Sequence, residues 1–440
     1  MSELIVTGGK KLKGVIVNQP AKNSALAIVC ACLLIKQKVI LRDVPQIEEI
    51  KRMLELLNSI GVKAGFVGPR QVEIDSSGNL YLDKMDKKSA LAMRSSLLLF
   101  GALAKRIKRY KLYKSGGCRL GERTVRPHIF ALGQLGVKIN SKAGYYEVNN
   151  SVLRGQEIVM YESGDTATEN TIMASVLAQG TTIIKMASAN YMVSDLCYFL
   201  NSAGAKISGI GSATLTIEGV KQLRAVQNYH IMPDPIVAMT FLSVGIATGS
   251  HVTVADCPLD FLELELCKLR VMGQKFKIKK RRQSANGYFK VADIELIPSP
   301  LFALLDKIYG RPFPGLNVDN LPLFVPILCQ ARGRTLVHDW AYENRSIYLL
   351  DLQKMGVKIT MLDPHRIWVE GPTEFKPASL KCPPALRVAV VLLICMLAAK
   401  GRSILSNTYA IDRGYENIYS VLNQAGADIK IVDDNKSKIK

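Results

Sequence analysis

A short loop that holds one cysteine among basic residues is the part of the sequence most suited to chemistry. It covers residues 114–128 and reads KSGGCRLGERTVRPH. Two glycines precede Cys118, and glycine allows a backbone to approach a ligand closely. Nearby cations favour the thiolate over the thiol, and the thiolate is the reactive form of cysteine. The loop therefore predicts a reactive Cys118 next to a site for an anion.

The other cysteines have a plainer interpretation. Cys30, Cys32, Cys329 and Cys395 lie in apolar runs, where a cysteine is usually a small buried hydrophobic residue. The chain has nine cysteines, an odd number, and it has neither a CxxC pair nor a Cys/His cluster with zinc spacing. We therefore expect reduced thiols, no disulfide framework, no metal site and no cofactor.

The length and the apolar content predict a folded protein of two or three domains. A chain of 440 residues is too long for one ordinary core, and 48% of it is hydrophobic. The longest apolar runs, residues 25–35 and 388–399, are shorter than the ~18 residues that a membrane span needs, so we expect buried helices. The first residues do not follow the pattern of a signal peptide, and the expected location is the cytoplasm.

Positive charge is the unusual feature of the composition. There are 58 lysines and arginines against 37 acidic residues, and the resulting net charge of +21 attracts polyanions. The densest basic run, KIKKRR at residues 277–282, has no interleaved aromatic residues of the kind that RNA-binding motifs contain, and we interpret it as a solvated turn. Nucleic-acid binding is an alternative that depends on net charge alone, and we expect no nucleic-acid partner.

The sequence repeats one pattern six times. Each copy has a leucine, three further residues, a glycine and then a short alternating stretch, as in LNSIGVKAG and LNSAGAKIS. We interpret each copy as the end of an amphipathic helix, a glycine cap with positive φ, and an outgoing strand. The glycines, which are 68 to 83 residues apart, are Gly61, Gly136, Gly204, Gly273, Gly356 and Gly426.

These repeats predict a mixed α/β (α+β) fold with two similar lobes. Upstream of most caps is a helix that is apolar nearly all round, as expected for a helix inside a domain and sheathed by sheets. Six units, three per domain, would form one lobe from residues 22–230 and another from residues 1–21 and 231–440. The boundary is placed there because residues 227–235 are rich in turn formers. A cleft between the lobes would follow.

Several short motifs make the whole chain resemble the enolpyruvyl transferases. The motifs are GGC at residues 116–118, AKNS at 21–24, MRSS at 93–96, TATENTIM at 166–173, ENR at 343–345 and IDRGYE at 411–416. The resemblance implies two inside-out α/β barrels of three units each. It also implies transfer of an enolpyruvyl group from phosphoenolpyruvate to UDP-N-acetylglucosamine, the first committed step of peptidoglycan synthesis. The branch that acts on shikimate 3-phosphate is less similar, because its Asn-Ala-Gly-Thr turn is absent at residues 90–94.

The resemblance implies a set of substrate-binding residues. Phosphoenolpyruvate carries a carboxylate and a phosphate, so several fixed cations are needed to bind it, and closure of the lobes would gather them and expel water. The cations at matching family positions are Lys22, Arg123, Arg345, Arg387 and Arg413. Any one of these arginines alone could be a surface salt bridge, which contributes little stability. Further implied contacts are Asn23 to the sugar, Arg94, and His128 near the nucleotide, although a lone histidine is more often structural.

This reaction needs an acid and a base at separate places, because the acceptor hydroxyl loses a proton while the methylene carbon of phosphoenolpyruvate gains one. The resemblance implies Cys118 as the acid, Asp319 as the base and Lys22 as a further catalytic residue. Residues 314–319 read PGLNVD and lack the proline that usually stands shortly before the aspartate, so we expect a less firmly held carboxylate. Ala385 replaces an aspartate near Arg387, and we expect that arginine also to be held less firmly.

The segments that contact the acceptor depart most from the family pattern. Residues 124–127 read TVRP where Pro-Val-Asp-Leu usually helps to hold the uracil ring, so the donor Arg126 replaces an acceptor carboxylate. Residues 164–166 read GDT, and Leu98 stands where many members have tryptophan. Arg126 could still bind a uracil carbonyl, and Asp165 could supply the lost acceptor. We expect a monomer that uses UDP-N-acetylglucosamine; another acceptor and a non-catalytic paralogue remain the alternatives.

Overall fold

The computed structural model of the protein describes residues 2–114 and 124–433. Within this part, the chain divides into two compact units. The first unit consists of residues 20–114 and 124–232, and the second unit consists of residues 2–19 and 233–433. The predicted site residues Cys118 and Arg123 lie outside the described residues.

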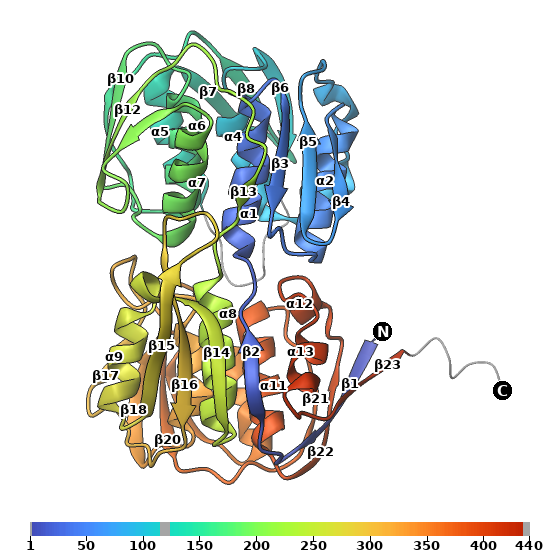
Figure 1. Ribbon diagram of the computed structural model, residues 1–440, viewed down its shortest axis with the longest axis vertical. Coiled ribbons are helices and arrows are strands. Elements are labelled where there is room, and N and C mark those ends of the chain that lie inside the picture. The colour runs from blue at the N-terminus through green and yellow to red at the C-terminus, as the bar shows by residue number, and fades with distance from the viewer. Residues whose placement is uncertain (1, 115–123, 434–440) are drawn as a thin grey trace, which may run out of the picture. The chain divides into compact units, whose positions relative to one another are not determined.

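Three sheets enclose the first unit (Figure 1). The first sheet has the strand order β13 (Tyr229–His230), β3 (Lys38–Arg42), β5 (Gln71–Asp75) and β4 (Lys63–Gly68). The second sheet has the order β6 (Arg109–Tyr113), β8 (Tyr145–Asn150) and β7 (Val137–Ser141). The third sheet has the order β11 (Lys206–Ser208), β12 (Thr214–Glu218), β10 (Thr181–Lys185) and β9 (Glu157–Val159).

Each sheet of the first unit covers an inner helix that is almost entirely buried. The inner helices are α1 (Lys22–Ala31), η3 (Arg94–Leu98) continued by α4 (Leu99–Ala102), and α6 (Asp165–Ser175). The helices that end at repeat glycines are α2 (Glu48–Ser59), α5 (Arg126–Leu135) and α7 (Tyr191–Ser202). Shorter helices are η1 (Cys32–Leu34), η2 (Leu82–Lys84) and α3 (Lys87–Ala92). From Ser24 onward every residue of α1 is buried, because no charged side chain follows Lys22.

The second unit also has three sheets in its described residues. The first has the order β15 (Lys275–Gln283), β16 (Lys290–Ile297), β14 (His251–Pro258) and β2 (Lys13–Val17). The second has the order β17 (Lys307–Tyr309), β18 (Gly333–His338), β20 (Arg366–Gly371) and β19 (Lys358–Asp363). The third has the order β21 (Ser379–Lys381), β22 (Gly401–Ser406), β1 (Ser2–Gly8) and β23 (Ile429–Asp433). The N-terminal segment therefore supplies a strand to two sheets of this unit.

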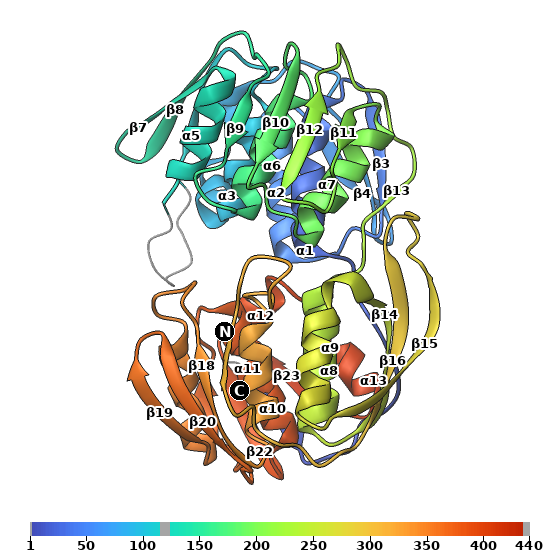
Figure 2. The ribbon, with the colours of Figure 1, turned by 90° about the vertical axis from the view of Figure 1, so that its left-hand side faces the viewer.

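The inner helices of the second unit pack against one another between these sheets (Figure 2). They are α8 (Pro235–Ala247), η5 (Leu321–Phe324) continued by α10 (Val325–Leu328), and α11 (Leu386–Ala398). The remaining helices are η4 (Leu259–Phe261), α9 (Glu263–Val271), η6 (Ser346–Met355), α12 (Tyr409–Asp412) and α13 (Ile418–Gln424). The three inner helices lie between the sheets, as the sequence predicted for its apolar helices.

The six repeat glycines have the predicted conformation. All of them have positive φ, between 86° and 103°, and each precedes a strand. Only glycine adopts this left-handed geometry without a steric penalty from Cβ, which explains why the same residue recurs at every helix end. The sixfold repeat of helix, cap and strand is therefore confirmed in the structure.

Helix α8 shows how an apolar inner helix is tied down by a few polar groups. All of its residues are buried, and Asp234 caps its first turn by accepting hydrogen bonds from the backbone N–H groups of Ile236 (2.7 Å) and Val237 (3.3 Å). The hydroxyl of Thr240 donates to the carbonyl of Ile236 (2.9 Å), and that of Ser243 donates to the carbonyl of Leu323 (2.7 Å). These bonds satisfy buried polar atoms, as folded proteins require.

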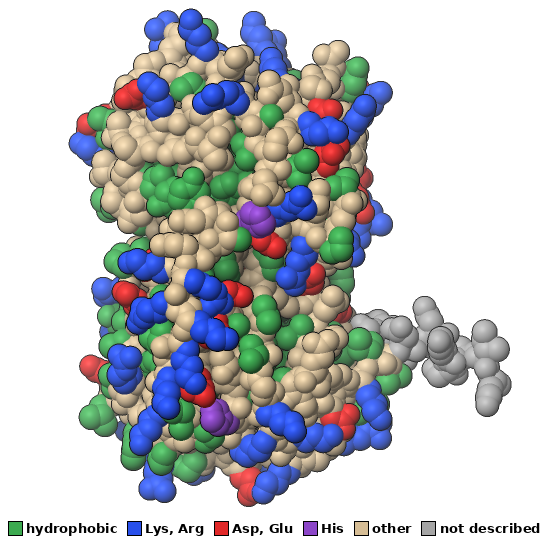
Figure 3. Space-filling model, in the orientation of Figure 1, with side chains coloured by type: hydrophobic (Ala, Val, Ile, Leu, Met, Phe, Trp, Pro, Cys, Tyr) green, Lys and Arg blue, Asp and Glu red, His purple; other side chains and the backbone are tan. Residues whose placement is uncertain are grey.

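The basic run at residues 277–282 is not a turn, which corrects the sequence-based expectation. It lies in β15, an edge strand whose backbone pairs with β16. Its side chains are largely exposed, and basic groups gather over β15 in Figure 3. Lys279 forms an ion pair with Glu295 (2.7 Å), and Arg282 forms one with Asp293 (2.9 Å). Lysines along an edge strand oppose pairing with another chain, which is a common protective device.

The predicted core cysteines are confirmed. Cys30, Cys32, Cys329 and Cys395 are buried, and the eight cysteines in the described part of the chain are free thiols. None of the helices within residues 2–114 and 124–433 combines the length and the hydropathy needed to cross a bilayer.

A buried histidine joins α5 to α6 in the first unit. His128 is 3% exposed, and its Nδ1 lies 2.9 Å from Nδ2 of Asn170. The backbone N–H of Gly101 donates to Oδ1 of Asn170, so the amide nitrogen must face the histidine and Nδ1 must accept. Nε2 therefore carries the proton and points to Oγ1 of Thr166, 3.4 Å away. Burial, and secondarily the charge of Arg94, lower the pKa of His128 to about 4.

Gly133 inside α5 and Gly136 at its C-cap make a matched test of the glycine cap. Gly136→Ala should lower the free energy of unfolding by about 1–2 kcal/mol, because a side chain at φ 103° is strained and its Cβ would lie 2.6 Å from Oγ of Ser151. Gly133→Ala should raise it by about 0.5–1 kcal/mol, because that glycine is inside the helix and faces open space. Urea denaturation followed by circular dichroism measures both, and equal effects would contradict the role of the cap.

The low pKa of His128 predicts acid sensitivity of the fold. A folded pKa of about 4 lies below the usual value of about 6.5, so the unfolded state binds a proton first as the pH falls. Stability should therefore drop by about 2 kcal/mol between about pH 6.5 and pH 5. His128→Gln should lose most of this dependence, whereas His251→Gln, at an exposed histidine, should keep it. The measurement is the free energy of unfolding from urea denaturation at several pH values. An equal decrease of this free energy with falling pH in wild type and His128→Gln would count against the prediction.

Candidate active site

A buried arginine organises the polar contacts of the second unit. Arg345 is 1% exposed, and its guanidinium donates to both carboxylate oxygens of Asp339 and to the carbonyl of Val318. Its carbon Cζ also lies 4.1 Å from the ring centre of Tyr342. Burial raises the pKa of Asp339, and the charge of Arg345 opposes that shift. A charge this deeply buried is tolerated because it is paired on several sides.

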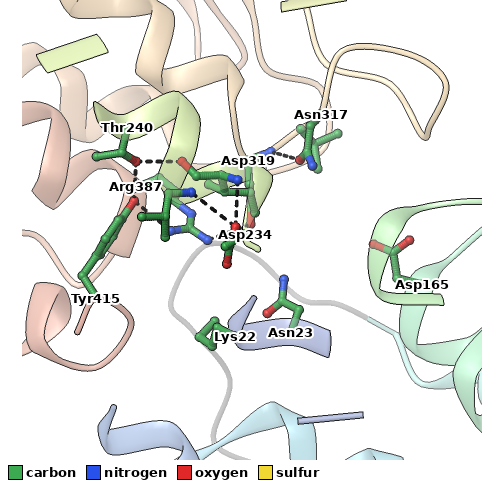
Figure 4. Close-up of polar contacts among 12 residues, drawn as sticks. Lys22, Asn23, Asp165, Asp234, Thr240, Asn317, Asp319, Arg387 and Tyr415 are labelled. Atoms are coloured by element: carbon green, nitrogen blue, oxygen red, sulfur yellow. Dashed lines mark hydrogen bonds and ion pairs between the residues drawn. The ribbon is translucent and has the colours of Figure 1, made fainter. Parts of the chain in front are cut away.

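Asp319 lies close to two arginines, Arg345 and Arg387, of which Figure 4 labels the second. Its Oδ1 is 3.4 Å from Nη1 of Arg345, and its Oδ2 is 3.6 Å from Nη2 of Arg387. The hydroxyl of Tyr342 donates to Oδ1 at 3.3 Å. The structure thus brings together three of the predicted site residues, one carboxylate and two cations, within one unit.

Asparagine contacts hold the segment before Asp319 in the absence of the family's proline. Oδ1 of Asn317 accepts the backbone N–H of Asp319 at 2.9 Å. Oε1 of Glu265, on α9, accepts the backbone N–H of Asn317 (3.2 Å) and Nδ2 of Asn320 (2.8 Å). Glu265 is buried, and that burial raises its pKa. The loosely held carboxylate expected from the sequence is therefore not what the structure shows.

Arg387 likewise has partners that do not require a carboxylate at position 385. Ala385 is the N-cap of α11 and makes no side-chain hydrogen bond. Nη1 of Arg387 instead donates to the hydroxyl of Tyr415 at 2.9 Å. Arg387 is 6% exposed and its guanidinium lies 5.4 Å from the ring centre of Tyr415. Tyr415 and Asp319, two partners from different parts of the chain, therefore fix this cation.

Arg413 differs from the other two arginines. It is half-buried at the C-cap of α12, and it forms no ion pair with any residue that the structure describes. Its role in binding phosphoenolpyruvate stays a prediction.

In the first unit, Lys22 and Asn23 are the first residues of α1. Nζ of Lys22 lies 2.9 Å from Oε2 of Glu49, and both side chains are largely buried. Nδ2 of Asn23 donates to the hydroxyl of Tyr191 at 3.1 Å. No side chain caps α1, so its first N–H groups add a positive end next to both residues.

The remaining predicted residues of the first unit already have protein partners. Nη2 of Arg94 donates to the carbonyl of Thr124 at 3.3 Å, and both ring nitrogens of His128 face protein groups. Arg126 is exposed, with Cζ 5.2 Å from the ring centre of Tyr161. Asp165 accepts from Oγ of Ser188 at 2.6 Å and from the side chain of Asn190. The substrate contacts of these residues stay predictions.

Sequence reasoning missed the residues that hold the predicted ones. They are Glu49 for Lys22, Asp339 and Tyr342 for Arg345, Tyr415 for Arg387, and Glu265 and Asn317 for Asp319. Tyr415 could have been found, because it lies in the IDRGYE motif. Asn317 lies in the PGLNVD stretch, and Asp339 and Tyr342 lie shortly before Arg345, but no pattern marks their role. Glu49 and Glu265 have no local signal, because they lie 27 positions from Lys22 and 52 positions from Asn317.

Comparison with known proteins places this chain in a family. The model of the EPSP synthase (3-phosphoshikimate 1-carboxyvinyltransferase) family matches residues 6–422. The UDP-N-acetylglucosamine 1-carboxyvinyltransferase of Dichelobacter nodosus is 34% identical over 442 aligned positions, which cover 99% of this chain and 100% of that protein. The enzyme of the same name from Bacteroides thetaiotaomicron is 33% identical over 437 positions, covering 98% and 99%.

Solved structures show the same fold at lower sequence identity. The enolpyruvyl transferase NikO from Streptomyces tendae superposes with a TM-score of 0.85 at 22% identity, covering 98% of this chain and 99% of that chain. An EPSP synthase from Acinetobacter baumannii gives a TM-score of 0.73 at 17% identity, covering 98% and 100%. From the family match and from its identity to relatives over nearly its whole length, the chain belongs to the EPSP synthase family of carboxyvinyltransferases.

Proposed function

We propose that this protein transfers the enolpyruvyl group of phosphoenolpyruvate to the 3′-hydroxyl of UDP-N-acetylglucosamine and releases phosphate. The observation that carries the proposal is the cluster of the half-buried Asp319 with the buried Arg345 and Arg387, in a chain that is similar from end to end to relatives bearing that enzyme's name. A paralogue without activity would have no reason to keep two buried cations at one carboxylate, because buried charges are costly to maintain.

The proposed reaction uses these residues in distinct roles. Asp319 takes the proton of the acceptor hydroxyl while the hydroxyl oxygen attacks C2 of phosphoenolpyruvate, and Cys118 gives a proton to C3. Loss of a proton from C3 and of phosphate from C2 then restores the double bond, so one acceptor and one phosphoenolpyruvate yield one enolpyruvyl ether and one phosphate. Lys22, Arg123, Arg345, Arg387 and Arg413 bind the carboxylate and phosphate.

The other assignments are part of the same proposal. Asn23 binds the sugar, and Arg94 and His128 lie near the nucleotide, where His128 acts by holding α6 in place. The enzyme works as a monomer in the cytoplasm, and its free thiols support a reducing compartment. No nucleic acid is needed for this function.

A second candidate is transfer to a different acceptor, and one observation favours it. Arg126 and Asp165, the two residues that would have to replace the family's contacts to uracil, already engage Tyr161, Ser188 and Asn190. Fold and mechanism would be unchanged under this alternative. Only the nucleotide contacts would differ.

Phosphate release decides between these functions. Purified protein with phosphoenolpyruvate should release phosphate when UDP-N-acetylglucosamine is added, and none with shikimate 3-phosphate or with other nucleotides, because the chain lacks the turn of the shikimate branch. Cys118→Ala should abolish the release, which excludes a contaminating phosphatase. Release with another acceptor alone would overturn the substrate, and release with none would favour a non-catalytic paralogue.

Asp319→Ala separates catalysis from binding. Turnover should fall by about two to four orders of magnitude, the range for loss of a general base, while phosphoenolpyruvate still binds through the arginines. Steady-state kinetics and calorimetric titration with phosphoenolpyruvate measure the two effects. Asp363→Ala is the matched control, because Asp363 is an aspartate of the same unit whose ion pair with Arg366 is at the surface. Near-normal turnover of Asp319→Ala would require another base.

A further inference from the structure

A buried chain of hydrogen bonds leads from Arg387 into the middle of helix α8. Nη1 of Arg387 lies 2.9 Å from the hydroxyl of Tyr415, and that hydroxyl lies 2.9 Å from Oγ1 of Thr240. Oγ1 of Thr240 lies 2.9 Å from the carbonyl oxygen of Ile236. Tyr415 is 2% exposed and Thr240 is fully buried. Figure 4 shows the first two contacts.

The direction of every bond in this chain follows from its two ends. A guanidinium can only donate, so the oxygen of Tyr415 accepts from Arg387. A backbone carbonyl can only accept, so the single proton of the Thr240 hydroxyl is used on Ile236. Thr240 has no second proton for the tyrosine, and Tyr415 must therefore donate to Thr240. The chain runs in one direction from Arg387 through Tyr415 and Thr240 to Ile236.

This direction of donation leaves a lone pair of the Tyr415 oxygen free to accept from Arg387. With its proton committed to Thr240, Tyr415 presents a lone pair to Nη1 of Arg387. The guanidinium is planar and rigid, so fixing Nη1 also fixes Nη2, which lies 3.6 Å from Oδ2 of Asp319. The anchor is firm because every residue of α8 is buried and its first turn is capped by Asp234.

We propose that Tyr415 and Thr240 are positioning residues that orient Arg387 toward Asp319 and toward phosphoenolpyruvate. The inference rests on the proposed function, because it assigns Arg387 to that ligand. Neither residue touches the reacting atoms in this account. Tyr415 acts on the arginine, and Thr240 acts on the tyrosine by taking its proton.

The alternative interpretation is a purely structural one, in which these hydroxyls only satisfy each other's hydrogen-bonding capacity in the core. Folded proteins pair nearly all buried polar groups, so such a network needs no function. The two accounts differ in what a variant changes. A purely structural pair alters the free energy of unfolding, whereas a positioning pair alters the affinity for phosphoenolpyruvate through an arginine that has not been mutated.

Helix α8 itself provides the matched control. Ser243 is a second buried hydroxyl, three residues after Thr240, and it donates to the carbonyl of Leu323 at 2.7 Å. It is not connected to Arg387 by any hydrogen bond that the structure describes. Ser243→Ala should lower stability without changing the binding of phosphoenolpyruvate.

The experiment compares five variants with wild type: Tyr415→Phe, Thr240→Val, Thr240→Ser, the double variant Tyr415→Phe/Thr240→Val, and Ser243→Ala. Tyr415→Phe should raise KM for phosphoenolpyruvate about tenfold or more, the size expected for a lost hydrogen bond to a charged group, with KM for the acceptor nearly unchanged. Thr240→Val should raise the same KM less, because it removes the partner of the tyrosine and leaves the bond from Arg387 to Tyr415 possible. Thr240→Ser keeps the hydroxyl and should have the kinetics of wild type. The double variant should be no worse than Tyr415→Phe, because Thr240 acts only through the tyrosine.

Calorimetric titration with phosphoenolpyruvate alone separates this inference from the proposed function. If wild type binds phosphoenolpyruvate but does not use UDP-N-acetylglucosamine, the proposed acceptor fails, and the same order of dissociation constants among the variants still supports the positioning role. Wild-type affinity in Tyr415→Phe and Thr240→Val, or an equal loss in Ser243→Ala, would overturn it. Circular dichroism confirms folding. If Tyr415→Phe does not fold, the comparison of Thr240→Val with Thr240→Ser and Ser243→Ala tests the positioning role.

Discussion

The burial of helices that are apolar on every side is the constraint on which this structure depends. Helices such as α8 and α11 carry hydrophobic residues all round, so a single sheet cannot cover them. Three sheets around three inner helices solve the problem within each unit, as far as the structure describes the chain. The glycine caps end the other helices of each unit, where the chain turns sharply from a helix into a strand of a sheet.

This arrangement gives the starts of the inner helices a shared chemical property. In the described residues every inner helix has a residue with a charged or amide side chain in its first turn or just before it. They are Lys22 and Asn23 at α1, Arg94 at η3, Asp165 at α6, Asp234 at α8, Asp319 at η5 and Arg387 at α11. The first N–H groups of a helix have no partner within it and carry partial positive charge. Apart from Glu169 in α6, the charged side chains of the inner helices lie at these beginnings, whereas the polar groups further along α8 are buried hydroxyls such as those of Thr240 and Ser243.

The buried charges of the second unit are stable because each has several partners. Arg345 bonds to Asp339 and Val318, and Arg387 bonds to Tyr415, while both approach Asp319. Removing one member of such a group leaves another charge buried without compensation, which costs far more than the pair contributes. The chain keeps this group in place with residues of its own. Asn317 and Glu265 hold the segment before Asp319, and Tyr415 holds Arg387, although Ala385 has no side chain that could do so.

The sequence by itself determined the repeat, the fold class and the identity of the principal residues. Gly61 and its five counterparts, the apolar helices and motifs such as ENR and IDRGYE are local patterns, and local patterns can be read from neighbours along the chain. The tertiary structure decided what holds those residues. Thr240 contacts Tyr415 across 175 positions of sequence, and Glu265 contacts Asn320 across 55, so no window of sequence contains both partners. It also decided that residues 277–282 form an edge strand, because pairing with β16 outweighs the low strand propensity of lysine.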